Sequence, residues 1–207
     1  MTSLQSFEER RGGWTGGAMS STPLRWSAPD GAWTEPDLHL FPQDGHRYEI
    51  VDGSLHVAPP PPESHEAVAR AVALALRAAA PPGWWVCNRT GVVINEGTGG
   101  ASNLVPDVTV LRPRSSGAIW CDPADVALVV EVETPATRRF DRFLKPTLYA
   151  EAGIGAFWRV EPGRGGPVLR TYELGGARYR LTKSIEGAEP VKLDAPFPIQ
   201  VAPAAWA

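Results

Sequence analysis

One stretch of the chain combines the pattern of a buried strand with two carboxylates. Residues 126–130 are all valine, alanine or leucine, and they lead directly into Glu131, Val132 and Glu133. An apolar run of this kind predicts a central strand covered on both faces. Side chains alternate along a strand, so Glu131 and Glu133 are expected on one face, roughly 7 Å apart at a rise of about 3.3 Å per residue. Such carboxylates need a cation or hydrogen bonds to offset their loss of hydration.

A third acid, Asp107, lies in a similar apolar setting, and a lysine, Lys145, follows further along the chain. Asp107 lies within the mostly apolar run 104–111, 24 positions before Glu131, and Lys145 follows Glu131 by 14 positions. An aspartate and a glutamate on adjacent strands, with a lysine nearby, form the arrangement that metal-assisted phosphodiester cleavage requires. Carboxylate oxygens bind Mg²⁺, the metal activates water, and a lysine can orient that water and stabilise charge on the phosphate.

The bulk composition limits the class of protein. With 207 residues and a net charge of −3, the chain predicts one domain without a broad basic surface, which does not favour nonspecific nucleic-acid binding. Two distant cysteines fit a reducing compartment, and no run of about 18 apolar residues indicates a membrane span. We therefore expect a cytoplasmic protein with no membrane association. Residues 1–30, rich in Gly, Ser and Thr, predict a disordered leader, and residues 31–207 a single domain.

The hydrophobic patterns predict a mixed α/β fold. A short helix is expected from residue 34 to about 41, a longer helix over 63–80, and a third over 137–152. The turn 52–54 predicts a hairpin of strands 47–51 and 55–58. Further strands are expected at 84–87, 91–95, 107–111, 126–133, 156–160, 169–174, 179–181 and 191–193, with an edge segment at 197–201.

Several ordered motifs resemble the Uma family of restriction endonucleases, within the PD-(D/E)XK nuclease superfamily. These motifs are Arg47-Tyr48-Glu49-Ile50-Val51-Asp52-Gly53, Ala58-Pro59 followed by His65, Val105-Pro106-Asp107-Val108, Val130-Glu131-Val132-Glu133-Thr134-Pro135, and Asp141, Lys145 and Tyr149-Ala150-Glu151-Ala152-Gly153. The resemblance covers about residues 33–195. It implies a restriction-endonuclease-like mixed sheet flanked by helices, with an N-terminal hairpin and additional C-terminal strands.

The resemblance also implies roles for individual residues. Asp107 and Glu131 match the metal-binding acids, and Lys145 matches a lysine on the following helix. Glu49 matches an acid of the first hairpin, and His65 a histidine at the start of the long helix. We expect Mg²⁺ (or Mn²⁺) on Asp107 and Glu131, with the Val132 carbonyl as a third ligand. Lys145 orients the water, Glu49 and Glu133 bind a second cation or position the first, and His65 lies at the rim.

Two departures from the family pattern affect this interpretation. Glu133 stands where this family usually has an apolar residue. It is equally explained as a solvent-exposed residue at the end of the strand. Pro146 follows Lys145 directly, so the lysine keeps its place only if the helix begins near residue 143. Arg138 and Arg139, with Arg142, form a basic turn that either contacts phosphate or pairs with Asp141 and Glu151 at the surface.

The leading hypothesis is therefore a Mg²⁺-dependent nuclease acting on nucleic acid, with DNA as the expected substrate. A homodimer is expected by analogy with restriction enzymes. The alternative is a catalytically silent family member that binds nucleic acid or another protein. A third candidate, an unrelated small-molecule hydrolase, lacks a Gly-x-Ser-x-Gly elbow or a phosphate-cradling loop.

Overall fold

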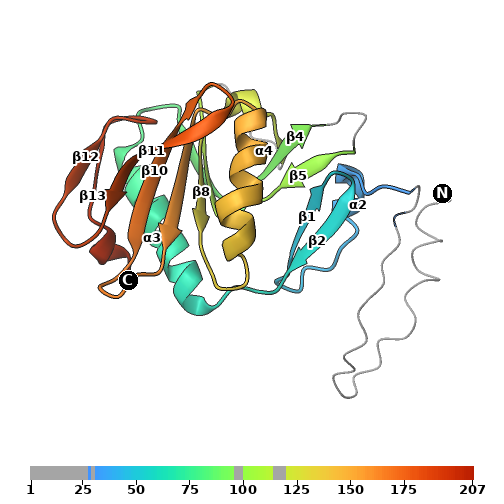
Figure 1. The fold of residues 1–207 in the computed structure, drawn as a ribbon, viewed down its shortest axis with the longest axis horizontal. Helices are drawn as coiled ribbons and strands as arrows, with labels where there is room; N and C mark the ends of the chain where they lie inside the picture. Colours follow the sequence, from blue (N-terminus) through green and yellow to red (C-terminus); the bar gives the residue numbers. More distant parts are fainter. Residues whose placement is uncertain (1–27, 29–30, 96–99, 114–119) are drawn as a thin grey trace, which may run out of the picture.

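The structure is a computed structural model, and it describes residues 28, 31–95, 100–113 and 120–207. The predicted leader, residues 1–30, lies outside the described residues except for Ala28. The described chain forms mixed sheets flanked by a few helices, as the sequence predicts (Figure 1). None of its described helices combines the length and the apolar character needed to cross a bilayer.

A six-stranded mixed sheet forms the centre of the fold. Its order is β11 (Arg178–Ile185), β10 (Val168–Gly175), β9 (Ala156–Glu161), β8 (Val126–Val132), β6 (Val108–Leu111) and β3 (Trp85–Asn88). Strand β8 lies in the interior, antiparallel to β6 and parallel to β9, and all its residues are buried. The prediction of a central strand here is confirmed. Both faces of β8 are covered by other parts of the fold, which explains why its apolar run is continuous.

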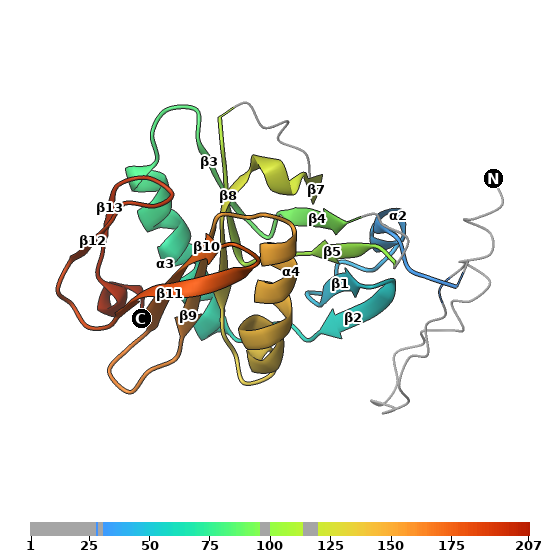
Figure 2. The same ribbon diagram turned by 45° about the horizontal axis from the view of Figure 1, so that its top comes forward.

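A second sheet contains the N-terminal hairpin. Its order is β2 (Ser54–Ala58), β1 (Arg47–Val51), β5 (Ser102–Leu104), β4 (Gly91–Asn95) and β7 (Trp120–Cys121). The hairpin turns through Asp52 and Gly53, which both have positive φ, as a two-residue turn between twisted strands requires. Figure 2 shows the hairpin beside α4, on the side of the molecule away from β12 and β13.

Two helices cover opposite faces of the central sheet (Figure 1). Helix α3 (Glu63–Ala79) buries Val72, Ala73 and Leu76 against one face. Helix α4 (Lys145–Glu151) lies over the other face, where Leu148 and Tyr149 pack in a core shared with the second sheet. Full burial of one such aliphatic side chain stabilises the fold by about 1.5–3 kcal/mol.

The smaller elements complete the chain. They are α2 (Glu35–Leu38), the 3₁₀ helices η1 (Pro123–Asp125) and η3 (Pro203–Trp206), the π-helix η2 (Phe140–Leu144), and the paired strands β12 (Val191–Leu193) and β13 (Ile199–Val201). The single helix predicted over 137–152 is in fact η2 followed by α4. Strands β5 and β7 were not predicted, because they are too short to give a periodic pattern.

Candidate active site

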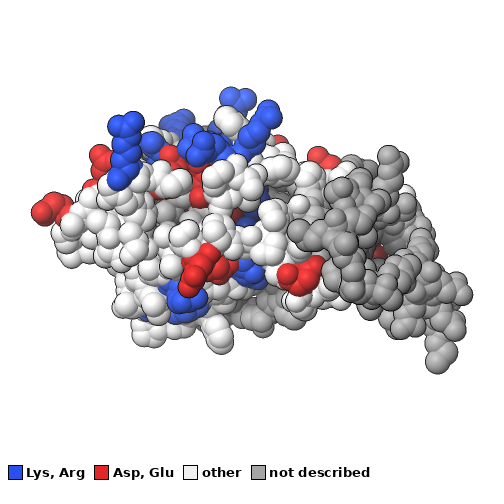
Figure 3. Space-filling view, turned by 90° about the horizontal axis from the view of Figure 1, so that it is seen from below, with Lys and Arg blue, Asp and Glu red and all other residues white. Residues whose placement is uncertain are grey.

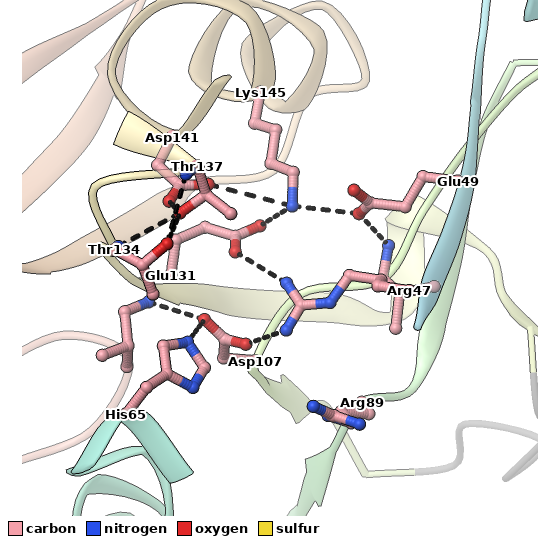
Figure 4. A network of polar contacts seen from close by, with 12 residues as sticks. Arg47, Glu49, His65, Arg89, Asp107, Glu131, Thr134, Thr137, Asp141 and Lys145 are labelled. Atoms are coloured by element: carbon pink, nitrogen blue, oxygen red, sulfur yellow. Dashed lines mark hydrogen bonds and ion pairs between the residues drawn. The ribbon is translucent and has the colours of Figure 1, made fainter. Parts of the chain in front are cut away.

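Two carboxylates lie side by side at the heart of the central sheet. Asp107 immediately precedes β6, and Glu131 lies in β8. Because Val108 pairs with Val130 in an antiparallel ladder, Asp107 stands opposite Glu131, and opposite residues point to the same face. The two residues are 2% and 0% exposed. The structure thus brings together the two acids that the sequence places in separate apolar runs (Figure 4).

Arg47, from β1, reaches both acids. Its guanidinium donates to Oδ1 of Asp107, and its Nη1 lies 3.7 Å from Oε2 of Glu131. Arg47 is itself only 9% exposed. Arg47 lies within the first family motif, but the sequence alone indicates no role for it. The available signal was its position two residues before Glu49, which places both side chains on one face of the hairpin.

Lys145 completes the centre from the opposite side. Its Nζ lies 3.1 Å from Oε1 of Glu131, 2.9 Å from Oε1 of Glu49 and 3.9 Å from Oδ1 of Asp141. The side chain is 2% exposed, so this lysine is not a solvated helix residue. Tyr149, one turn later in α4, donates to the same Oε1 of Glu131 at 2.7 Å. The spacing of Asp141, Lys145 and Tyr149 thus places all three side chains around the acids.

The π-helix explains how Lys145 keeps this position next to Pro146. Lys145 has ordinary helical angles, and its N–H donates to the carbonyl of Phe140, five residues earlier. Pro146 falls in the first turn of α4, where its missing N–H costs little. The wider turn of η2 therefore ends just before α4 begins, and it leaves Lys145 in helical geometry with Pro146 in the first turn of α4. Such π turns are frequent at functional sites.

One carboxylate oxygen of Asp107, Oδ2, is held by the main chain and by His65. Oδ2 accepts a hydrogen bond of 2.7 Å from the Val132 N–H and lies 3.2 Å from Nε2 of His65. His65 is buried in the first turn of α3. Glu49 is fixed in a comparable way, since its Oε1 accepts from the Val105 N–H at 2.8 Å. Both acids are therefore positioned by donors that do not depend on a bound ion.

Burial and the neighbouring charges both shift the pKa values of the buried groups, and attractive charges oppose the effect of burial. Burial would raise the pKa of Asp107, but Arg47 and the hydrogen bond with His65 lower it well below its ordinary value. Burial raises the pKa of Glu131 above its ordinary value, and Asp141 and Asp107 add to that rise while Lys145 opposes it. Burial would lower the pKa of Lys145, but the charges of Glu131 and Glu49 raise it instead. The centre therefore holds more acidic than basic side chains, and burial favours the protonated form of Glu131 and Asp141.

The structure does not bring Glu133 to this centre. Strand β8 ends at Val132, and the Glu133 carboxylate accepts hydrogen bonds from Nε of Arg138 at 2.7 Å and Nε of Arg142 at 2.6 Å. Arg142 also contacts Glu161, 3.2 Å away. The sequence placed Glu131 and Glu133 together on one strand face. In the structure, the arginines neutralise Glu133 instead, and they do so in place of the predicted pairing with Asp141 and Glu151.

Basic and acidic side chains are mixed both around these arginines and on the face seen in Figure 3. Arg138 is about half-exposed and Arg139 is exposed, while Glu133 lies beneath them. Figure 3 shows Lys and Arg side chains gathered along one margin of the molecule with acidic groups among them. This margin is therefore not uniformly basic, in keeping with the acidic net charge of −3.

A pocket of about 210 Å³ opens beside the buried acids. Arg47 and His65 form one part of its wall, and the remainder comes from Ala58, the proline run 59–62 and the loop 134–137. The lining is mostly proline and alanine, and its other polar residues are Thr134 and Thr137. This is the usual composition of a small-ligand site.

Comparisons with known proteins place the chain in a family. Residues 35–205 match the model of the Uma2 family, which is described as "Putative restriction endonuclease". The chain belongs to the Uma2 family. The family resemblance expected from the sequence motifs is thereby confirmed. A search of curated proteins gave no match.

A solved structure agrees with the fold of this Uma2 protein. It is a crystal structure of "a putative nuclease belonging to DUF820" from Anabaena variabilis, with a TM-score of 0.56. The alignment covers 75% of this chain and 87% of that chain, at 14% sequence identity. At this identity the likeness concerns the fold alone, a mixed α/β arrangement of sheets flanked by a few helices.

Restriction-endonuclease-like families generally use divalent metals, so we tested whether the residues of this Uma2 protein fit one. The described residues contain no group of three or more His, Cys, Asp and Glu arranged to hold a metal ion. Mg²⁺ however commonly binds through only one or two carboxylates plus water and substrate phosphate. Oε2 of Glu131 is buried and accepts no hydrogen bond within the described part of the chain.

The charges of the centre also suit a divalent cation. Four acids, Glu49, Asp107, Glu131 and Asp141, surround two full positive charges, those of Arg47 and Lys145. A further cation would favour the ionised form of these buried acids and balance the charge that Arg47 and Lys145 leave uncompensated. The donor set therefore fits a divalent metal on Asp107 and Glu131.

Proposed function

We propose that this protein is a Mg²⁺-dependent nuclease that hydrolyses phosphodiester bonds in DNA. The observation that supports the proposal is the buried contact of Lys145 with Glu131, opposite Asp107, in a chain of the Uma2 family. An ionised lysine beside two acids on adjacent strands is the arrangement that metal-assisted hydrolysis uses.

In this proposal each residue has a separate task. Asp107 and Glu131 would hold the metal (Mg²⁺, or Mn²⁺ in its place), with the Val132 carbonyl as a third ligand. The cation, when bound, supplies Lewis acidity and activates water at neutral pH. Lys145 orients the attacking water and stabilises negative charge on the phosphate. Glu49, 2.9 Å from the Lys145 amine, keeps the lysine charged and aimed at Glu131.

Substrate contacts are assigned to the rim. His65 lines the pocket beside Asp107, where a phosphate or sugar of the bound strand can lie. Arg138 is about half-exposed and Arg139 is exposed in the helical segment that leads into η2, and both guanidinium groups can contact phosphates further along the strand. A homodimer, which cutting two strands favours, is part of the same proposal.

A second candidate function is a catalytically silent Uma2 member that binds nucleic acid or protein. One observation favours it: Arg47 already pairs with both proposed metal ligands. In such a protein the buried acids and bases would serve the stability of the fold, and metal would not bind.

The deciding experiment is cleavage of supercoiled plasmid, single-stranded DNA and RNA across a Mg²⁺ and Mn²⁺ titration. Wild type is compared with Asp107→Asn, Lys145→Met and a control, Glu151→Gln, which alters an exposed acid at the end of α4. The proposal expects metal-dependent cleavage by wild type and the control, and none by the other two. Cleavage by Asp107→Asn equal to wild type, or no cleavage of any substrate, would contradict it.

A further inference from the structure

The oxygens of Asp107 and Glu131 divide into two sets. Oδ2 of Asp107 faces the Val132 N–H and His65, and Oε1 of Glu131 is taken by Lys145 and Tyr149. The other two oxygens, Oδ1 of Asp107 and Oε2 of Glu131, both face the Arg47 guanidinium (Figure 4). The oxygens that remain for a shared cation are therefore the two that Arg47 contacts.

We propose that Arg47 and the divalent cation compete for this one position, so that metal binding moves the guanidinium out into the adjoining pocket. The inference rests on the proposed function, because it concerns the same metal ligands. Mg²⁺ binds carboxylate oxygens at about 2.1 Å, so an ion held by both acids would have to approach these two oxygens closely. The Arg47 guanidinium already donates to Oδ1, and its Nη1 lies 3.7 Å from Oε2, so it occupies that approach.

The exchange is electrostatically favourable in this centre. Replacing one positive charge by two adds charge where four acids outnumber the two cations. The 210 Å³ pocket can receive the displaced guanidinium, because the Arg47 side chain already lines it. A guanidinium in that pocket can bind a phosphate through two parallel hydrogen bonds. Arg47 is thus a positioning residue that links metal binding to phosphate binding.

The competing explanation is that Arg47 is a fixed counter-ion. In that case the guanidinium holds the two carboxylates in place, and its removal would loosen them and weaken metal binding. The two explanations therefore predict opposite changes in metal affinity when Arg47 is neutralised.

The test is isothermal titration of the full chain with Mn²⁺ alone. The variant Arg47→Met removes the charge and keeps an unbranched side chain. The control Arg89→Met removes a guanidinium that also lies near Asp107 in Figure 4, but whose side chain pairs with Glu66 at the surface. We expect Arg47→Met to bind Mn²⁺ about tenfold or more tightly than wild type, the equivalent of one charged hydrogen bond. Arg89→Met should match wild type.

A second measurement covers the case in which Arg47→Met does not fold. In wild type, the side-chain Nε–H signal of Arg47, assigned by its loss in Arg47→Lys, should shift on Mg²⁺ titration, while the Arg89 signal should not. An unmoved Arg47 signal at saturating Mg²⁺ would overturn the exchange.

The outcomes separate this inference from the proposed function. If wild type binds Mn²⁺ and Arg47→Met binds equally or more weakly, the exchange is wrong and the nuclease proposal stands. If only Arg47→Met binds Mn²⁺, the competition is supported and the wild-type chain is silent. If neither protein binds Mn²⁺, both proposals fail.

Discussion

The Lys145 amine lies 3.1 Å from Oε1 of Glu131, inside a centre where both side chains are almost fully buried. Transferring either charge alone from water into such a site is strongly unfavourable. Each charge therefore depends on the other, and Glu49 supplies a second partner to the lysine at 2.9 Å. The contact that would position Lys145 for the proposed catalysis also makes this lysine a major element of the folded state.

Lys145→Met should destabilise the protein by about 3–5 kcal/mol near pH 8, because it leaves buried carboxylates without their cation. The loss is measured by urea unfolding. Lys192→Met, which alters a lysine 69% exposed, is the matched control and should change stability by less than about 0.5 kcal/mol. A Lys145→Met protein as stable as wild type would mean that the lysine is solvated in solution.

Glu131→Gln should remove the effect of Mg²⁺ on thermal stability. If the proposed site binds Mg²⁺, the ion at one hundred times its dissociation constant should stabilise the wild-type native state by about 2.7 kcal/mol. The glutamine keeps an oxygen for the Tyr149 hydroxyl, which donates to Glu131 at 2.7 Å, but it lacks the charge that a metal ligand needs. Melting curves with and without Mg²⁺ provide the measurement. An equal Mg²⁺ shift in both proteins would exclude Glu131 as a ligand.

The sequence predicted the strands of the centre well, because burial on both faces leaves a continuous apolar run. It therefore located Asp107 and Glu131 and their adjacency in the sheet. Helix α3 was also predicted to within one residue, 63–80 against Glu63–Ala79, since its apolar stripe and its following prolines are local signals.

Contacts between distant elements were not predictable in the same way. Arg47 reaches Asp107 across 60 positions, and nothing local distinguishes it from an exposed hairpin residue. Glu133 shares the strand alternation of Glu131, yet tertiary contacts with Arg138 and Arg142 neutralise it elsewhere. The π-helix was missed because Pro146 is a local signal for a helix start and does not reveal the wider turn before it.

Glu133→Gln tests whether metal binding depends on Glu133 as well as on Glu131. Because its carboxylate pairs with arginines, the variant should keep the wild-type stabilisation by Mg²⁺ and the wild-type Mn²⁺ affinity. It should lose about 1–3 kcal/mol of stability, since it weakens charged hydrogen bonds to a buried group. Titration calorimetry and urea unfolding measure the two effects. A marked loss of Mn²⁺ affinity would restore Glu133 to the metal site.

Asp141 gives the centre a dependence of stability on pH. Burial raises the pKa of Asp141 to about 6, and Asp107 and Glu49 add to the rise, while Lys145 and the Thr137 hydroxyl oppose it. A carboxyl whose pKa is higher in the folded state than in the unfolded chain stabilises the fold at low pH. That contribution is fully present below the unfolded value near 4 and is lost as pH rises through about 6.

Asp141→Asn should therefore raise stability at pH 8 by up to about 3 kcal/mol relative to wild type, and by much less at pH 4.5. The amide can still accept the hydrogen bond from Thr137, which is 2.5 Å long in wild type. Urea unfolding of both proteins at several pH values gives the difference directly. Asp194→Asn, at a carboxylate 85% exposed, is the control and should show no such trend. If Asp141→Asn is instead less stable than wild type at pH 8, the attraction between Asp141 and Lys145 at 3.9 Å outweighs the cost of burying the charge.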